Sequence, residues 1–287
     1  MKTFLFPGQG SQAKGMGGDL FDKFAALTAK ADGILGYSIK TLCLDNPERR
    51  LNETQFTQPA LYVVNALSYF RKLENGSTRP DYVAGHSLGE YNALLAAECF
   101  DFETGLRLVK MRGELMARAP EGRMAAIMNA SREKVEAILR DNRLANVDVA
   151  NYNTPKQIVI SGKADEVQQA QSLFQQGEVM YYPLNTSGAF HSRLMLAASE
   201  EFNAFLSGFR FAAPAIPVIA NITARPYQEG EVAANLTAQL AGSVLWSDGI
   251  QYLMNLGLPG DEMVFEEVGH GNVLTRMLSQ IPKASHT

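Results

Sequence analysis

The stretch DYVAGHSLGEYNALLAA, residues 81–97, decides the fold of this chain. A short apolar run at 82–84 is followed by the pattern Gly-x-Ser-x-Gly and then by a helical segment. Gly85 and Gly89 permit the close backbone approach of a sharp strand-to-helix turn, which places Ser87 at its tip. A turn with a capping serine is the alternative, because the bare pattern often arises by chance. The strand before it and the helix after it favour a nucleophilic serine in an α/β fold.

A nucleophilic serine needs N–H donors for the oxyanion that forms after its attack. The N–H of Leu88, at the start of the helix, is the first expected donor. The loop PGQG, residues 7–10, follows the first apolar run, and it offers the backbone N–H of Gln9. If the two strands are parallel neighbours, both loops lie at the carboxyl edge where α/β sheets bind ligands. A tight turn without a ligand is the alternative for Gln9.

Four apolar runs indicate the strands of a larger domain. They are residues 3–6, 82–84, 217–220 and 264–268. Helical segments lie between them, which is typical of a parallel sheet with helices on both faces.

The middle of the chain has a different order of elements. Strands are expected at 124–128, 147–151, 157–161 and 179–184, helices at 131–140 and 164–176, and a turn at 152–156. The order βαββαβ is that of a ferredoxin-like domain. We therefore predict an α/β-hydrolase-like domain formed by 1–121 and 190–287, with a ferredoxin-like small domain, 122–189, inserted into it. A cleft between the two is the expected site.

The composition is that of a soluble globular protein, with 46% hydrophobic and 20% charged residues in 287. The net charge of −4 gives no indication of a nucleic-acid surface. No apolar run approaches the ~20 residues of a membrane span, and the N-terminus does not resemble a signal peptide. Cys43 and Cys99 stand singly in apolar contexts, which predicts free thiols in a reducing, cytoplasmic compartment. No metal site and no cofactor are expected.

The serine also needs a base, and the chain has only four histidines. His286 falls in a tail that is expected to fray, and His86 should point away from its neighbour Ser87. His191 is favoured because it lies where the chain re-enters the larger domain, and His270 is the weaker alternative. No Asp before His191 ends a predicted strand of the larger domain, so a Ser–His dyad fits better than a triad.

The helix LVKMRGELM, residues 108–116, carries a charge on its apolar face. Arg112 lies three or four positions from each member of the stripe Leu108, Val109, Leu115 and Met116. A charged side chain is seldom buried without a partner. The pattern therefore predicts an anionic partner for Arg112, and a buried Glu such as Glu90 is one structural alternative.

Six motifs in this order resemble the malonyl-CoA:acyl carrier protein transacylases. They are FPGQGSQ (6–12), TQFTQPAL (54–61), GHSLGEY (85–91), MRGELM (111–116), GAFHS (188–192) and FEEVGHGNVL (265–274). The resemblance covers nearly the whole chain, and that family has the same two-part build. It implies a malonyl group carried from malonyl-CoA, through a seryl ester, to the thiol of an acyl carrier protein.

The resemblance also implies roles for single residues. The family's nucleophile matches Ser87, and its base matches His191. The N–H donors to the oxyanion match Gln9 and Leu88, and the residue whose backbone carbonyl orients the base matches Gln239. The arginine that binds the malonyl carboxylate matches Arg112, a glutamine near it matches Gln58, and the bulky residue found in malonyl-selective members matches Phe190.

Finer features are similar to the discrete acyltransferases of trans-acyltransferase polyketide synthases, with fatty acid synthesis as the other context. A proofreading acyl hydrolase of the same fold and a non-catalytic docking subunit are the competing functions. A monomer is expected. Two positions depart from the family pattern, His270 where Pro is usual and Glu98 where Gly is frequent.

Overall fold

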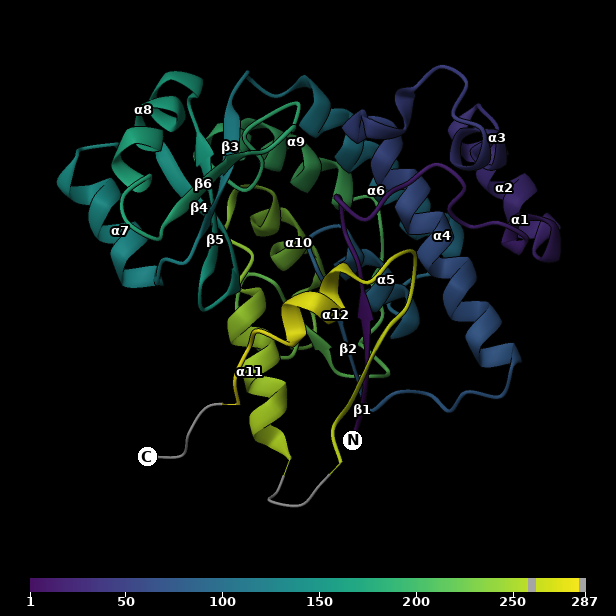
Figure 1. Ribbon diagram of the computed structural model, residues 1–287. Helices are drawn as coiled ribbons and strands as arrows, with labels where there is room; N and C mark the ends of the chain where they lie inside the picture. The colour runs from purple at the N-terminus through teal and green to yellow at the C-terminus, as the bar shows by residue number, and fades with distance from the viewer. Residues whose placement is uncertain (258–261, 284–287) are drawn as a thin grey trace.

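The structure is a computed structural model that describes residues 1–257 and 262–283. The four strands predicted for the larger domain form one parallel sheet in the order β7-β2-β1-β8 (Figure 1). They are β1 (Lys2–Phe6), β2 (Tyr82–Gly85), β7 (Val218–Ile219) and β8 (Val264–Glu267). All three pairings are parallel, so the loops after β1 and β2 lie at the same sheet edge, as the sequence predicts.

Helices cover both faces of this sheet, because its strands are apolar on both sides. Phe4 and Phe6 of β1 pack into the main core, while Leu5 packs into a second cluster with Trp246 and Leu274. The helices are α1 (Leu20–Lys23), α2 (Ala25–Leu35), α3 (Ile39–Leu44), α4 (Thr54–Glu74), α5 (Gly89–Ala96), α6 (Phe102–Arg118), α9 (Leu196–Leu206), α10 (Val232–Ala241), α11 (Trp246–Leu256) and α12 (Val273–Leu278), with 3-10 turns η1 (Arg50–Asn52) and η2 (Arg193–Met195). No helix of the described residues is long and apolar enough to cross a membrane.

The middle of the chain forms a separate antiparallel sheet in the order β4-β5-β3-β6, the arrangement of a ferredoxin-like unit. It contains β3 (Arg123–Met128), α7 (Arg132–Asp141), β4 (Val147–Thr154), β5 (Gln157–Gly162), α8 (Ala164–Phe174) and β6 (Met180–Pro183). The predicted fold class is thus confirmed. These elements lie inside the segment 122–189, whose limits as a domain remain a prediction.

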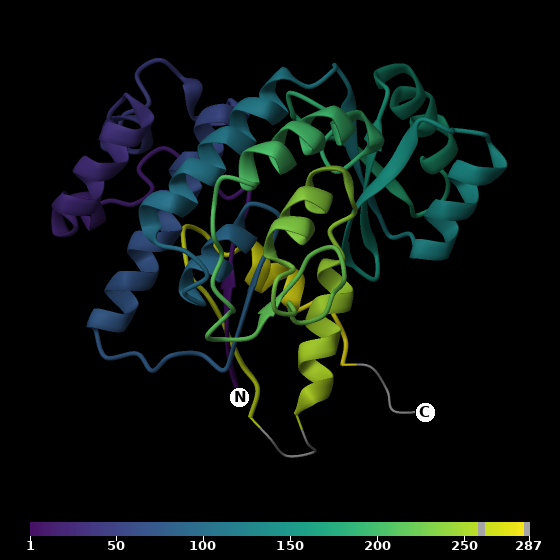
Figure 2. The ribbon, with the colours of Figure 1, turned by 180° about the vertical axis from the view of Figure 1, so that it is seen from behind.

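The turn predicted at 152–156 was wrong in its first half, because β4 continues to Thr154. Tyr152 pairs with Ile158 across the hairpin, and its N–H donates to the carbonyl of Val244 at 2.9 Å. The N–H of Val244 donates in turn to the carbonyl of Ala150 at 2.8 Å. The segment before α11 therefore joins the edge of the small sheet, which fixes the two parts against each other (Figure 2).

Glu98 ends α5 in a left-handed conformation, with a φ of 61°. Its N–H donates to the carbonyl of Leu95, and that of Cys99 donates to the carbonyl of Leu94, both at 3.0 Å. This is the Schellman pattern, in which the residue at the position of Glu98 is usually glycine. The departure noted in the sequence therefore places a residue with a Cβ where glycine is favoured.

Replacing Glu98 with glycine is expected to stabilise the protein by about 1 kcal/mol, because glycine has no Cβ to strain the left-handed backbone. The exposed ion pair with Arg79 that is lost should cost little. Urea denaturation would measure the change. Glu98→Ala is the control, since alanine keeps the Cβ and removes the same ion pair. Equal unfolding midpoints for the two variants would contradict the explanation.

Candidate active site

The turn after β2 holds Ser87 in a strained backbone conformation, with a φ of 52°. A Cβ on Gly85 would lie 1.9 Å from the carbonyl carbon of Gly89, and a Cβ on Gly89 would lie 2.0 Å from the carbonyl oxygen of Phe6. Both positions therefore require glycine. Asn221, just after β7, accepts from the N–H of Ser87 and donates to the carbonyl of Gly85, both at 2.7 Å. These contacts hold a conformation that costs roughly 1–3 kcal/mol.

His191 lies beside Ser87, as the sequence predicts for the base. The Ser87 Oγ and the His191 Nε2 are 2.7 Å apart, and the His191 Nδ1 lies 2.8 Å from the backbone carbonyl of Gln239. A carbonyl only accepts, so Nδ1 carries the proton and Nε2 is free to accept from the serine hydroxyl. Burial, together with the charge of Arg112, lowers the pKa of His191 to about 3. The imidazole is therefore neutral at physiological pH, the form that a base requires.

The other histidines have no hydrogen bond to Ser87 in the described residues. His86 also lines the cavity of Ser87, but its Nε2 lies 2.8 Å from the Asn153 Oδ1 on β4, so its side chain contacts the small sheet. His270 is not among the residues that line the cavity of Ser87. His286 lies outside the described residues.

A cavity of about 470 Å³ opens in front of Ser87, between the two sheets. Gln9 and Leu88 line it, and a Cβ on Gly8 would lie 2.2 Å from the carbonyl oxygen of His86, so the loop after β1 packs directly on the serine turn. In residues 1–257 and 262–283, neither the N–H of Gln9 nor that of Leu88 has a hydrogen-bond partner. Both remain available to an oxyanion, and their assignment as donors stays a prediction.

Arg112 lies in the same cavity and is 1% exposed. Its Nη1 donates to the Gln58 Oε1 at 2.6 Å, and its Nη2 donates to the Ser87 Oγ and the Gln239 Oε1, each at 3.0 Å. In the described part of the chain Nε has no partner, and no ion pair joins Arg112 to Glu90. The buried guanidinium is thus held by three neutral partners, and the anion that the helix pattern predicts is missing from its immediate contacts.

Gln58 and Phe190 complete the surroundings of Arg112. The Gln58 Nε2 donates to the Thr54 Oγ1, which donates to the Gln9 Oε1, both at 3.0 Å, so hydrogen bonds connect the arginine to the loop after β1. Phe190 is buried and lines the cavity together with Met116. The structure therefore brings all eight predicted site residues together.

Sequence reasoning missed Asn221 and Asn153. Asn221 lies two residues after the end of β7, where its side chain contacts the serine turn. Its place after a predicted strand was the available signal. Asn153 fell in the region that was predicted to be a turn.

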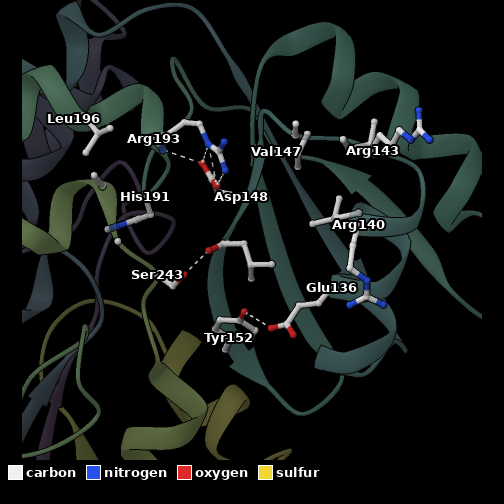
Figure 3. Close-up of a pocket in the computed structure, with 16 residues that line it drawn as sticks. Glu136, Arg140, Arg143, Val147, Asp148, Tyr152, His191, Arg193, Leu196 and Ser243 are labelled. Carbon is white, nitrogen blue, oxygen red and sulfur yellow. Dashed lines mark hydrogen bonds and ion pairs between the residues drawn. The ribbon is translucent and has the colours of Figure 1, made fainter.

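A larger hollow of about 840 Å³ lies on another side of the junction, between α7, β4 and the segment after α10 (Figure 3). The ion pair of Arg193 with Asp148 and the hydrogen bond from Tyr152 to Glu136 occupy its walls. His191 borders this hollow, but Ser87 does not line it. The cavity that Ser87 faces is therefore the smaller one.

Known proteins match this chain over nearly its full length. The acyl transferase domain family matches residues 3–279. The polyketide biosynthesis malonyl CoA-acyl carrier protein transacylase PksC of Bacillus subtilis is 58% identical over 285 residues, which cover 99% of this chain and 98% of that protein.

Solved structures of malonyl transacylases are also similar to this chain. A malonyl CoA-acyl carrier protein transacylase from Burkholderia pseudomallei has a TM-score of 0.97 at 56% identity, covering 100% of this chain and 99% of that one. A malonyl-transacylase in complex with a type II polyketide synthase acyl-carrier protein has a TM-score of 0.90 at 33% identity, covering 98% and 92%. From its match over residues 3–279 and the identity of these relatives, this chain belongs to the acyl transferase domain family.

Proposed function

We propose that this protein transfers a malonyl group from malonyl-CoA to the phosphopantetheine thiol of an acyl carrier protein. The observation that carries the proposal is the guanidinium of Arg112, buried in the cavity of the nucleophile and 3.0 Å from the Ser87 Oγ. An acyl group on this serine would begin beside a fixed cation, which suits an acyl group that ends in a carboxylate. The relatives named above carry the same activity in their names.

In the first half of the reaction, His191 Nε2 takes the proton of Ser87 as its Oγ attacks the thioester carbonyl. The backbone N–H groups of Gln9 and Leu88 stabilise the oxyanion. The intermediate collapses when the carbon–sulfur bond breaks, and the coenzyme A sulfur receives the proton from His191. In the second half, the carrier thiol gives its proton to His191 and attacks the seryl ester, and Ser87 recovers the proton as it leaves.

Arg112 provides the selectivity in this mechanism. Its guanidinium has five N–H donors, three of which bond to Gln58, Ser87 and Gln239, so two remain for a carboxylate. An acetyl group would leave them unpaired in a buried site, which costs several kcal/mol. Phe190 lines the same cavity and would restrict a substituent at the 2-position of the acyl group.

Transfer and hydrolysis are separated by the fate of the acyl group. The protein would be mixed with malonyl-CoA with and without a holo acyl carrier protein, and malonyl-carrier and free malonate would be counted by mass spectrometry. The proposal expects carrier loading to exceed malonate release by at least about 100-fold, since the thiol is the stronger nucleophile. Release of malonate at the same rate with and without carrier would identify a hydrolase instead.

We place this activity in polyketide synthesis, because the chain is 58% identical to PksC, with fatty acid synthesis as the other context. The proposal takes the coenzyme A thioester as substrate, requires no metal or cofactor, and has the protein act as a cytoplasmic monomer, with its two buried cysteines free.

A further inference from the structure

A carboxylate that the mechanism does not use lies beneath the dyad. Glu90, in the first turn of α5, is 0% exposed. The Tyr227 Oη donates to its Oε1 at 2.5 Å, and the N–H of Asn221 donates to the same oxygen at 3.2 Å. Its Oε2 accepts from the Gln239 Nε2. Burying an ionised carboxylate costs free energy even with three hydrogen-bond donors, unless an opposite charge lies nearby.

The side-chain amide of Gln239 connects this acid to the arginine. The Gln239 Oε1 accepts from the Arg112 Nη2 at 3.0 Å, while its Nε2 donates to Glu90 and to the carbonyl of Ser87. The backbone carbonyl of the same residue accepts from the His191 Nδ1. The side-chain amide of Gln239 therefore lies between the buried carboxylate and the buried guanidinium, while the backbone carbonyl of the same residue holds the base.

We propose that the ionised form of Glu90 is the counter-ion of Arg112 in the empty site, and that it takes up a proton when the substrate carboxylate pairs with Arg112. Acting through Gln239, it is a positioning residue that keeps the guanidinium aligned and balanced between turnovers. This inference rests on the proposed malonyl transfer. Besides the carboxylate of the malonyl group, the carboxylate of Glu90 then also affects which acyl group Arg112 selects.

The exchange follows from the number of charges in the buried site. Two carboxylates cannot both be balanced by one guanidinium, so the arrival of the second favours the protonated form of the first. Burial raises the pKa of Glu90 to about 7, although Tyr227, Gln239, Asn221 and Arg112 each oppose that rise. A further carboxylate on Arg112 raises the pKa again.

Glu90 is the one group around this network that changes charge near neutral pH. The charged and titratable groups that face it are Arg112 from α6, Tyr227 after β7 and Tyr91 on α5; α10 and the turn after β7 present the neutral amides of Gln239 and Asn221. Burial raises the pKa of both tyrosines, so they stay protonated, and the guanidinium stays charged. The low pKa of His191 keeps that base neutral throughout.

The sign of the pH effect follows from linkage. Below about pH 7 Glu90 is already protonated in the free protein, so the malonyl group binds without a proton. Above that pH Glu90 is ionised in the free protein, and it must take up a proton from the solvent each time a malonyl group pairs with Arg112. The second-order rate constant for malonylation of Ser87 should therefore fall by up to tenfold per pH unit. An acetyl group has no carboxylate and should not show this fall.

The test compares the acylation of Ser87 by malonyl-CoA and by acetyl-CoA at pH values from about 6 to 9, followed by intact-protein mass. We expect the malonyl-to-acetyl ratio of the wild-type protein to fall at least about tenfold between pH 7 and 9. In Glu90→Gln the ratio should be independent of pH. Tyr227→Phe removes a donor that lowers the pKa of Glu90, so the fall should begin at a higher pH.

Glu98→Gln is the matched control, because it makes the same change on an exposed glutamate just beyond α5 and should keep the wild-type profile. A wild-type ratio that stays flat while both adducts form would overturn the inference, and so would an unchanged fall in Glu90→Gln. If Glu90→Gln does not fold, the wild-type and Tyr227→Phe profiles decide. Failure of the proposed function looks different, because either no malonyl adduct would form at any pH, or the adduct would be released as malonate and not passed to a carrier.

Discussion

Ser87→Ala is expected to form no malonyl adduct with malonyl-CoA and to load carrier protein at least about 10⁴-fold more slowly than the wild-type protein. The reason is that the Ser87 Oγ is the hydroxyl that faces both His191 Nε2 and Arg112. Without it, the base has no proton to take and the acyl group has no covalent carrier. Intact-protein mass measures the adduct, and a carrier-loading assay measures the rate.

Ser207→Ala is the control, because it removes an exposed hydroxyl at the end of α9 and should leave both readouts unchanged. The circular dichroism spectrum of Ser87→Ala should match that of the wild-type protein. A malonyl adduct of undiminished yield on folded Ser87→Ala would mean that another residue is the nucleophile.

Arg112→Met is expected to reduce malonylation by about 10²–10⁴-fold and to raise acetylation several-fold. A buried carboxylate that loses its charged partner costs about 3–5 kcal/mol, which sets the first figure. Acetylation becomes faster because, in the variant, the acetyl group no longer leaves a buried guanidinium unpaired. Methionine keeps much of the volume, so the cavity that alanine would leave is largely avoided.

Competition between malonyl-CoA and acetyl-CoA for one protein sample measures this change of preference directly. Arg112→Lys is the matched variant, because it keeps a charge but cannot form a bidentate pair, so its preference should lie between those of wild type and Arg112→Met. A malonyl preference that survives in Arg112→Met would place the carboxylate elsewhere in the cavity.

The sequence was sufficient for features that depend on local pattern. The two glycines around Ser87 predict the turn because only glycine fits, and the structure places a backbone atom within about 2 Å of either missing Cβ. The strands of both sheets were predicted because apolar runs between turns are typical of buried strands. Arg112 was predicted to be buried because it interrupts an apolar stripe, and it is buried.

The features that escaped prediction depend on contacts between distant residues. Gln239 and Glu90 are 149 positions apart, and Asn221 and Ser87 are 134 positions apart. Neither pair has a periodicity or a motif that would bring it together, and a lone Gln or Asn is most often exposed. The role of Gln239 entered only through the family resemblance. The helix pattern offered Glu90 as a possible direct partner of Arg112, and their connection through the side chain of Gln239 became visible only in the structure.

The turn predicted at 152–156 was wrong over its first three residues for a related reason. Asn and Pro in this region favour a turn, but the edge of β4 gains backbone hydrogen bonds from Val244 in the other part of the chain. Tertiary pairing extended the strand by three residues beyond the predicted end at 151. Asn153 reaches His86 as a consequence, at 2.8 Å.

In the proposed function, Ser87 accepts an acyl group because that group ends in a carboxylate, and then passes it to a carrier thiol. The most direct measurement is intact-protein mass after the protein meets equal amounts of malonyl-, methylmalonyl- and acetyl-CoA, followed by addition of a holo acyl carrier protein. We predict that a malonyl adduct dominates and then moves to the carrier. A predominant acetyl adduct, or a malonyl adduct that the carrier does not remove, would contradict it.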